Sequence, residues 1–438
     1  AAYGSFNTFR ERATLLSRSG KADVVSAFSA FTTDGHRDGT GGNSVAGQLG
    51  VRVHLPGPGT VAFRDKIIQL DGGDPGPDIH PYTDHRFDVL RNTFSALLDY
   101  PTNTLHLKVV PWLNGGEHRL YDGFFSRDYT AGAVAECSDA FLKRRIQLLV
   151  GTAGEYVDGT VLNRISDTVT PVKELSSAGL YGQITAQPGL GLTGVCGGRL
   201  HHSNRYGSVP LYKAGLNWDP AESFSMHTRL TKNFRQPTLR ELYLPFPVAN
   251  PDLRPEIAVN WDAGMDVKTG RLRFGVTVFK TWATDMIKYF GEWPTAEVVN
   301  IDKLEIRGVE GECTLDPIGP FAAFVTASWQ DVGRFTKQNP DAKVNGRISY
   351  ISQRENGQLE LAVTGEWVHG LYMNNYKRDP LDNVFFIDGS ARYRTHGRGG
   401  IQLEPYCIVR NMLNSRYEYI HYYPMPGINF LAGLTLKV

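Results

Sequence analysis

Apolar and polar residues alternate with a period of two along most of this chain. Between residues 271 and 278, Leu272, Phe274, Val276 and Val278 are apolar, whereas the residues between them are polar or small. The same alternation runs through 223–234, 357–368 and 427–438. Successive side chains of a strand point to opposite faces, so each segment predicts a strand with one apolar and one polar face.

Applied to the whole chain, this pattern predicts an all-β protein of about 21 strands. They are expected at 5–17, 22–33, 44–55, 59–70, 85–99, 104–113, 128–137, 143–157, 178–187, 190–201, 211–218, 223–234, 256–267, 270–282, 303–315, 320–331, 342–354, 357–368, 383–394, 399–410 and 427–438.

The connections between these strands are of two unequal kinds. Tight turns such as 268–270 and 355–357 alternate with long irregular segments near 34–45, 71–85, 114–128, 157–178, 235–255, 283–300 and 369–382. Tight turns at one end and long loops at the other are typical of outer-membrane β-barrels, in which apolar faces contact lipid and polar faces line the lumen. A soluble β-sandwich also alternates, but its two ends are usually less unequal. The loops therefore favour an antiparallel transmembrane barrel.

The strand count raises a question about the start of the barrel, because single-chain bacterial barrels nearly always have an even number of strands. The segment 5–17 ends in a tight turn at Ser19-Gly20-Lys21 and should descend towards the periplasm. An upward strand is then expected before it. We predict that this strand comes from an upstream segment or a second polypeptide and pairs with both 5–17 and 427–438.

Composition excludes several other classes. Lys+Arg number 46 against 45 Asp+Glu, and this balance argues against a nucleic-acid partner, which needs a concentrated basic face. No apolar run approaches the roughly 18 residues of a membrane-spanning helix. The segment Gly189–Gly194 matches a nucleotide-binding G-x-G-x-x-G, but it lies between two expected strands and is better explained as a turn. No enzymatic constellation and no cofactor site is predicted.

Two boxes in the long segment 235–255 and its flanks carry a family resemblance. The first box contains Phe234, Arg235, Pro237, Glu241 and Tyr243; the second contains Asn250, Pro251, Leu253, Pro255 and Glu256. Together with the segments 300–310 and 410–427, they closely resemble the barrels of TonB-dependent outer-membrane receptors, in the order expected for that family.

The resemblance implies a 22-stranded barrel in the outer membrane of a Gram-negative cell, in contact with outer-membrane lipid. Residues 1–438 would form a single barrel, from which the family's N-terminal plug domain and TonB box are absent. A plug, upstream or in a separate chain, and a TonB-type energy transducer acting through it would then be partners in uptake of a scarce ligand, such as an iron-siderophore or cobalamin. The alternative is a plugless, receptor-derived barrel that serves as a structural or scaffold component of a multiprotein envelope complex.

Candidate site residues lie in the long loops. Tyr243, Phe246, Tyr289 and Trp293 could hold a ligand by stacking, or could belong to an interfacial aromatic girdle. For Arg235, Glu241 and Glu256, a hydrogen-bonded clamp that sets the loop's shape is favoured over ligand contact. No metal site is predicted. Asp71, Asp74 and Asp78 are candidate calcium ligands, but a solvated turn explains them better.

Overall fold

The computed structural model describes residues 1–143, 145–244, 249–291, 296–395, 397 and 399–438. Within them lie one short helix, α1 (Leu239–Tyr243), and 23 strands. The strands are β1 (Ala2–Gly4), β2 (Thr8–Arg18), β3 (Ala22–Thr33), β4 (Gly42–His54), β5 (Thr60–Gly73), β6 (Arg86–Pro101), β7 (Leu105–Leu120), β8 (Phe124–Phe141), β9 (Ile146–Asn163), β10 (Thr168–Thr170), β11 (Leu175–Gly189), β12 (Leu192–Ser203), β13 (Gly207–Ala221), β14 (Phe224–Arg235), β15 (Glu256–Thr269), β16 (Leu272–Phe290), β17 (Glu297–Ile318), β18 (Phe321–Asp331), β19 (Ala342–Arg354), β20 (Gly357–His369), β21 (Val384–Thr395), β22 (Gln402–Arg410) and β23 (Asn429–Lys437).

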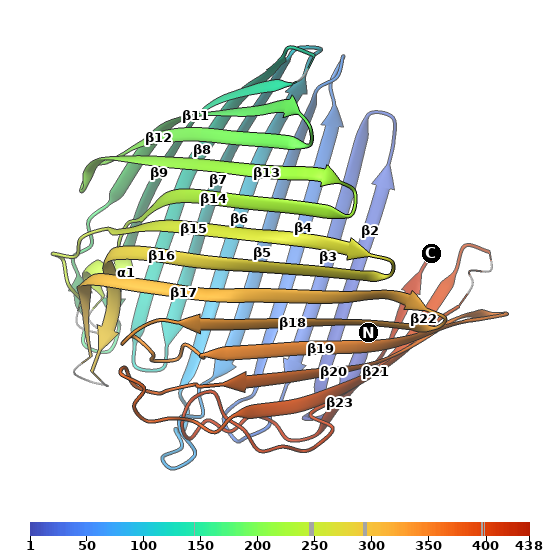
Figure 1. Ribbon diagram of the computed structural model, residues 1–438. Coiled ribbons are helices and arrows are strands. Elements are labelled where there is room, and N and C mark those ends of the chain that lie inside the picture. Colours follow the sequence, from blue (N-terminus) through green and yellow to red (C-terminus); the bar gives the residue numbers. More distant parts are fainter. Residues whose placement is uncertain (144, 245–248, 292–295, 396, 398) are drawn as a thin grey trace.

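The strands form one antiparallel sheet that closes on itself (Figure 1). Of the 23 strands, β10 pairs only with the end of β9, and β11 pairs with β9 directly, so the wall itself has 22 strands. The predicted fold class is confirmed. The two strands that the sequence did not predict, β1 and β10, are three residues long each.

The two ends of the barrel differ as the sequence predicted. Tight turns connect β11 to β12 at Gly189–Leu192, the G-x-G-x-x-G segment, and β15 to β16 at Thr269–Leu272. Long connections gather at the opposite end, where Figure 1 also shows α1. Several strands extend further into this end than predicted: β7 runs to Leu120 and β8 begins at Phe124, within the segment expected to be a loop. The outward positions there carry charged residues, Glu117 and Arg119 on β7 and Arg127 on β8.

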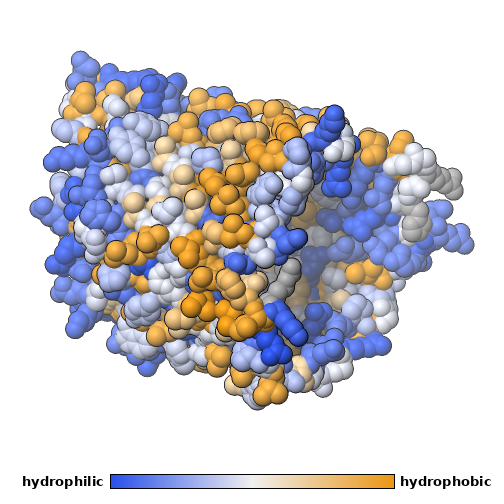
Figure 2. Space-filling view, turned by 90° about the horizontal axis from the view of Figure 1, so that it is seen from above, coloured by the Kyte–Doolittle hydropathy of each residue, from blue (hydrophilic) through white to orange (hydrophobic). Residues whose placement is uncertain are grey.

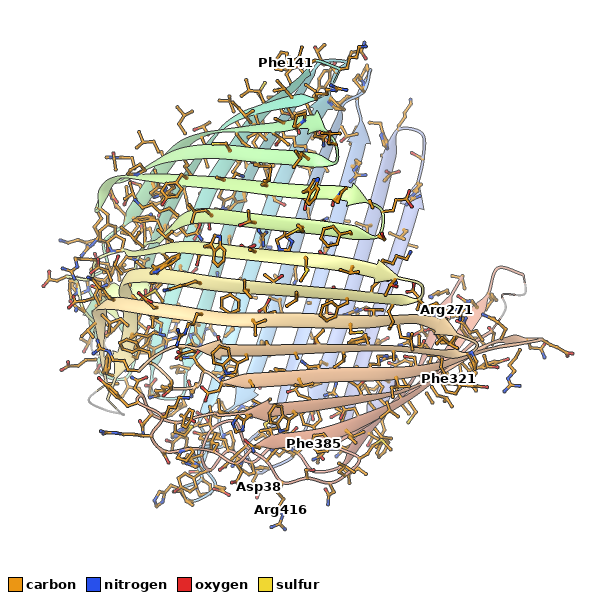
Figure 3. The ribbon with its side chains drawn as sticks, in the orientation of Figure 1. Asp38, Phe141, Arg271, Phe321, Phe385 and Arg416 are labelled. Atoms are coloured by element: carbon orange, nitrogen blue, oxygen red, sulfur yellow. The ribbon has the colours of Figure 1, made fainter. Side chains whose placement is uncertain are left out.

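The outward face of the wall is apolar. Along β16, Leu272, Phe274 and Val278 are exposed on the outside, and Arg273 and Thr277 point to the lumen between them. Figure 2 shows hydrophobic side chains gathered in a band with hydrophilic surface on either side of it. Figure 3 shows Arg271 and Phe321 near the turn end, with Asp38 and Arg416 at the loops. The free cysteines Cys196, Cys313 and Cys407 share the outward register of Leu192, Val309 and Val409.

The lumen is lined by polar and charged side chains that pair along the wall. Glu404 of β22 is buried among Arg392, Arg394 and Lys437, and Arg347 of β19 pairs with Glu360 of β20. In the part of the chain that the structure describes, buried apolar residues form two small clusters, one around Leu242 and one around Ile301. No helix among the described residues is long and apolar enough to cross a membrane. Strand pairing, rather than a central core, therefore holds the molecule together.

The barrel closes through β1, which lies between β2 and β23 and is antiparallel to both. The N–H and C=O of Ala1 are both bonded to Leu434, at 3.0 and 2.9 Å. An upward strand between β2 and β23 was predicted, and the structure has one, but the prediction that an upstream segment or a second polypeptide supplies it is not met here, because residues 2–4 of this chain form it. Towards the turn end the ladders across this seam stop after Arg10 of β2, so residues 11–18 have no partner on that edge among the described residues.

We predict that the two faces of β16 respond oppositely to a new charge. Val278→Arg places a guanidinium in the apolar band and should lower the free energy of unfolding by about 2–4 kcal/mol. Thr277, one residue away, faces the lumen opposite Glu310. Thr277→Arg should therefore change the free energy of unfolding by less than about 1 kcal/mol. Denaturant unfolding from lipid vesicles measures both. Equal losses for the two variants would show that the assignment of faces is wrong.

Candidate functional site

The connection between β14 and β15 folds inward as a capped helical turn. Thr238 is the N-cap of α1: its hydroxyl accepts from the Glu241 amide at 3.3 Å, and the Glu241 carboxylate accepts from the Thr238 amide at 2.8 Å. This reciprocal pair is a capping box, which satisfies backbone donors that a helix leaves free at its start. Its residues lie within the first of the two sequence boxes.

Arg235 joins the two ends of this connection. Its Nε and Nη2 donate to the two carboxylate oxygens of Glu256 at 2.6 and 2.7 Å, and its Nη1 donates to Glu241 at 3.1 and 3.2 Å. Glu256 also accepts from the Ile287 amide at 2.8 Å, so the clamp reaches β16. One guanidinium thus fixes β14, α1 and β15 relative to one another, which is the structural role that the sequence favoured for these residues.

An apolar cluster anchors α1 against the wall. Leu242 is fully buried, and it packs with residues from β11, β16, β17 and the second box: Leu175, Leu253, Ile287 and Val298. Asn250 donates from its side chain to the Val298 carbonyl at 3.2 Å. The two boxes therefore hold the helix inside the mouth of the barrel.

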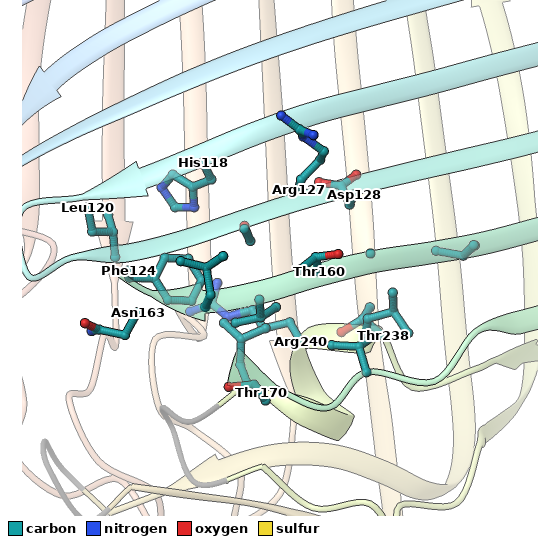
Figure 4. Close-up of a pocket in the computed structure, with 18 of the residues that line it drawn as sticks. His118, Leu120, Phe124, Arg127, Asp128, Thr160, Asn163, Thr170, Thr238 and Arg240 are labelled. Carbon is teal, nitrogen blue, oxygen red and sulfur yellow. The ribbon is translucent and has the colours of Figure 1, made fainter. Parts of the chain in front are cut away.

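A cavity of about 1120 Å³ lies between α1 and the β8–β9 wall (Figure 4). One side carries an aromatic stack in which His85 lies 4.2 Å from Tyr82 and 3.6 Å from Tyr121, measured between ring centroids. Leu175 and Phe124 add apolar surface, and hydroxyl groups are supplied by Thr160, Thr168, Thr170, Ser176, Ser177 and Thr238. The cavity can take an organic molecule that has both aromatic and polar parts.

Two arginines line this cavity, Arg127, which pairs with Glu117, and Arg240, which is exposed. Its neighbours in the loop are paired, Arg235 with Glu241 and Glu256 and Arg254 with Asp285. Arg240 projects from the first turn of α1 into the cavity and forms no ion pair with the residues that the structure describes. Arg240 can therefore bind an anionic ligand group, while the same lining also holds the carboxylates of Asp122, Asp128, which pairs with Arg91, and Glu155.

The residues predicted from the sequence to bind a ligand do not lie together in the structure. The Tyr243 ring packs on the apolar cluster, and its hydroxyl accepts from Arg205 at 2.7 Å, so this tyrosine supports the loop. Tyr289 lies on β16, exposed, and does not line the cavity. Phe246 and Trp293 lie outside the described residues. The predicted ligand role of these four residues stays a prediction.

Asp71, Asp74 and Asp78, the candidate calcium ligands, each bond to a different partner. Asp71 pairs with Arg86, Asp74 accepts from the Gly76 amide at 2.9 Å, and the Asp78 amide donates to the Tyr422 carbonyl at 2.7 Å. Among the described residues, no group of three or more histidine, cysteine, aspartate or glutamate side chains is placed to hold a metal ion. Asp71 lies on β5 and not in a loop, and the interpretation of the three residues as a solvated turn stays a prediction.

Sequence reasoning missed the residues that line the cavity. Arg240 lies inside the first box, but its sequence neighbours do not distinguish it from Arg235, which is paired. Tyr82, His85 and Tyr121 come from two separate connections, and no spacing in the sequence shows that they stack. Their juxtaposition depends on the pairing of β6 with β7.

His421 connects two further loops through contacts with two carboxylates, an arrangement called here the His421 clasp. His421, in the connection between β22 and β23, lies 3.2 Å from the Glu418 carboxylate through Nδ1 and 2.9 Å from Asp379 of the β20–β21 connection through Nε2. The hydrogen bond to Glu418, supported by the one to Asp379, raises the pKa of His421. The protonated ring donates to both carboxylates and so links the two loops.

A closed 22-stranded antiparallel wall with an apolar outer band and long loops at one end defines a transmembrane β-barrel of the outer membrane. A family model described as "TonB dependent receptor-like, beta-barrel" matches residues 4–411. The chain belongs to this family of TonB-dependent receptors.

Several solved structures share this fold. The siderophore receptor PirA from Pseudomonas aeruginosa aligns with a TM-score of 0.78 and 14% identity, over 98% of this chain and 77% of that one. The copper transporter OprC gives 0.81 and 13%, over 100% and 79%. The FrpB iron transporter from Neisseria meningitidis gives 0.79 and 13%, over 100% and 80%. At these identities the likeness establishes the fold.

We predict that Arg235 stabilises the mouth of the barrel. Arg235→Met leaves Glu241 and Glu256 without their cation and should cost about 2 kcal/mol, less than a fully buried pair because the Arg235 side chain is 42% exposed. Segment 236–255 should also become sensitive to proteolysis. The control is Arg229→Met on the same strand, whose single bond to Asp262 is worth less than about 1 kcal/mol. A loss for Arg235→Met no larger than the control would contradict the clamp.

We predict that the His421 clasp is pH-dependent. The pKa of His421 is raised on folding. Its contribution to the stability of the two loops is therefore complete below the ordinary histidine pKa of about 6.5 and is lost as the pH rises through the raised pKa. Amide exchange in 411–428, corrected for intrinsic rates, should therefore be faster above that range. His421→Gln should abolish the difference. An exchange pattern that is the same at acid and alkaline pH in the unmodified protein would rule out the clasp.

Proposed function

We propose that this barrel imports a scarce ligand across the outer membrane, such as an iron-siderophore or cobalamin. The observation that carries the proposal is the cavity beside α1, whose lining contains both Arg240, which forms no ion pair with the described residues, and the stacked rings of His85 and Tyr121. An anionic ligand with aromatic or apolar parts finds both kinds of partner there. The similar structures are named for siderophore, copper and iron transport, so they leave the ligand open.

We further propose that a plug, upstream in the polypeptide or in a separate chain, fills the lumen and connects it to a TonB-type energy transducer. A 22-stranded barrel is wide enough to need one. Support comes from the lumenal face of β2–β5, where Arg18, Arg52 and Arg64 surround a recess with Asp23 as their acidic neighbour. Asp23 is bonded to His54 instead, at 3.2 Å. Acidic groups of a plug would neutralise these arginines.

The second candidate is a structural role in a multiprotein envelope complex. It is favoured by one observation, a carboxylate on the outward face of the wall at Asp65. Mass spectrometry of the protein isolated from its host separates the two candidates. A plug sequence attached to or co-isolated with the barrel supports import, whereas a precursor whose signal peptide directly precedes Ala1, with no co-isolated plug, supports the structural role.

We predict that Arg240→Ala weakens ligand binding. Purified protein is titrated with a ferric catecholate, a ferric hydroxamate, ferric citrate and cyanocobalamin, and quenching of tryptophan fluorescence is followed. One of these probes should bind saturably, and Arg240→Ala should weaken its binding about tenfold or more, equivalent to about 1.4 kcal/mol.

The control for this experiment is Arg378→Ala, because Arg378 is an exposed loop arginine outside the cavity that lies over Tyr376. Its loss should leave the affinity unchanged. Saturable binding that survives Arg240→Ala unaltered would place the ligand elsewhere, and no saturable binding by any probe would count against import.

A further inference from the structure

The outward band of the barrel is almost free of charge. On strands β19–β23 its positions are occupied by residues such as Ile348, Leu361, Val363, Phe385 and Leu434. Few charged residues face outward elsewhere on the wall, and several of them are paired, for example Lys280 with Glu305 at 2.9 Å and Arg307 with Asp331 at 3.0 Å. This distribution is expected of a surface in contact with hydrocarbon.

Asp65 of β5 departs from that distribution. Its ladder partners are Leu49 of β4 and Phe94 of β6, and its outward neighbours along β5 are Phe63 and Ile67. All four are large, apolar and exposed, so Asp65 lies within the apolar band. The carboxylate is itself exposed.

A single polar neighbour accompanies it. Asn92, on the same outward face of β6, donates from Nδ2 to Asp65 Oδ1 at 2.9 Å. One neutral amide orients the carboxylate but leaves its charge uncompensated. A second outward carboxylate, Glu11, lies three strands away on β2 between Phe9 and Ala13 and is also exposed.

We propose that the outward face of β2–β6 is a docking surface for another membrane-embedded protein, which presents a lysine or arginine at the depth of Asp65. An ionised side chain that faces lipid is costly, and such residues in membrane proteins usually face a partner. Asp65 and Glu11 give this face a negative charge, so its occupant is basic.

A second copy of this chain fits the face poorly. Outward basic residues near this height are absent from β2–β6 in the described part of the chain, and two copies that met symmetrically would set carboxylate against carboxylate. Lys280 and Arg307, on the other side of the barrel, are already paired. The occupant is therefore a different protein. The inference depends on the outer surface only and not on the proposed import.

Dicyclohexylcarbodiimide tests the proposal, because it partitions into membranes and modifies carboxyl groups that hydrocarbon can reach. Asp65 labelling is measured by peptide mass spectrometry in two settings: native outer membranes at natural expression, and purified protein reconstituted in phosphatidylethanolamine–phosphatidylglycerol vesicles. We expect Asp65 to be labelled at least fivefold less in native membranes. Where the partner supplies a lysine, an amide cross-link from Asp65 to that lysine should also form, with the carbodiimide leaving as its urea.

The matched control is Val363→Asp, which places a carboxylate in the uncharged band between Ile348 and Gly389 on another part of the wall. It should be labelled equally in both settings. Asp65→Asn should lose both the label and the cross-link while the barrel still folds. Equal labelling of Asp65 in the two settings, at any level, would overturn the proposal, as would protection of the Val363→Asp carboxylate to the same degree.

Discussion

Hydrocarbon offers no hydrogen-bond partner to a peptide group, and the rest of this structure depends on that constraint. Each strand must satisfy its N–H and C=O groups on both edges, and a closed antiparallel wall is the arrangement that does so with strands. Closure fixes the register of every strand, and the register decides which side chains meet lipid and which meet the lumen. The pairing of Leu272, Phe274 and Val278 with outward residues of β15 and β17 is one consequence.

The same constraint explains why the mouth and the seam are built differently from the wall. Above the apolar band, where water is available, the chain can leave the ladder and fold as α1, and its free donors are then satisfied by the capping box and by Arg235. At the seam, β1 makes the ladder continuous for three residues on each side. Order at the mouth comes from side chains, whereas order in the wall comes from the backbone.

The sequence predicted what depends on alternation and missed what depends on proximity. Period-two patterning predicted 21 of the strands, but β1 and β10 are too short for any pattern to show. The Arg235 clamp was predictable because its carboxylates lie in two recognisable boxes. Arg240, His85 and Tyr121 come together only through the folded wall, and no local signal marks their cavity. Asp65 was also missed. A single charged residue among alternating apolar positions leaves the strand prediction unchanged, so the pattern does not mark it.

The arginines on the lumenal face of β2–β5 have a counterpart across the barrel. On the lumenal face of β15 and β17, Asp266, Glu310 and Glu312 are exposed, and the first and last of these flank Gly275. Figure 1 shows these strands on the opposite side of the barrel from β2–β5. The lumen is thus electrically polarised across its width. A charged molecule inside it would be drawn to one side, and a dipolar one would be turned, before any specific contact forms.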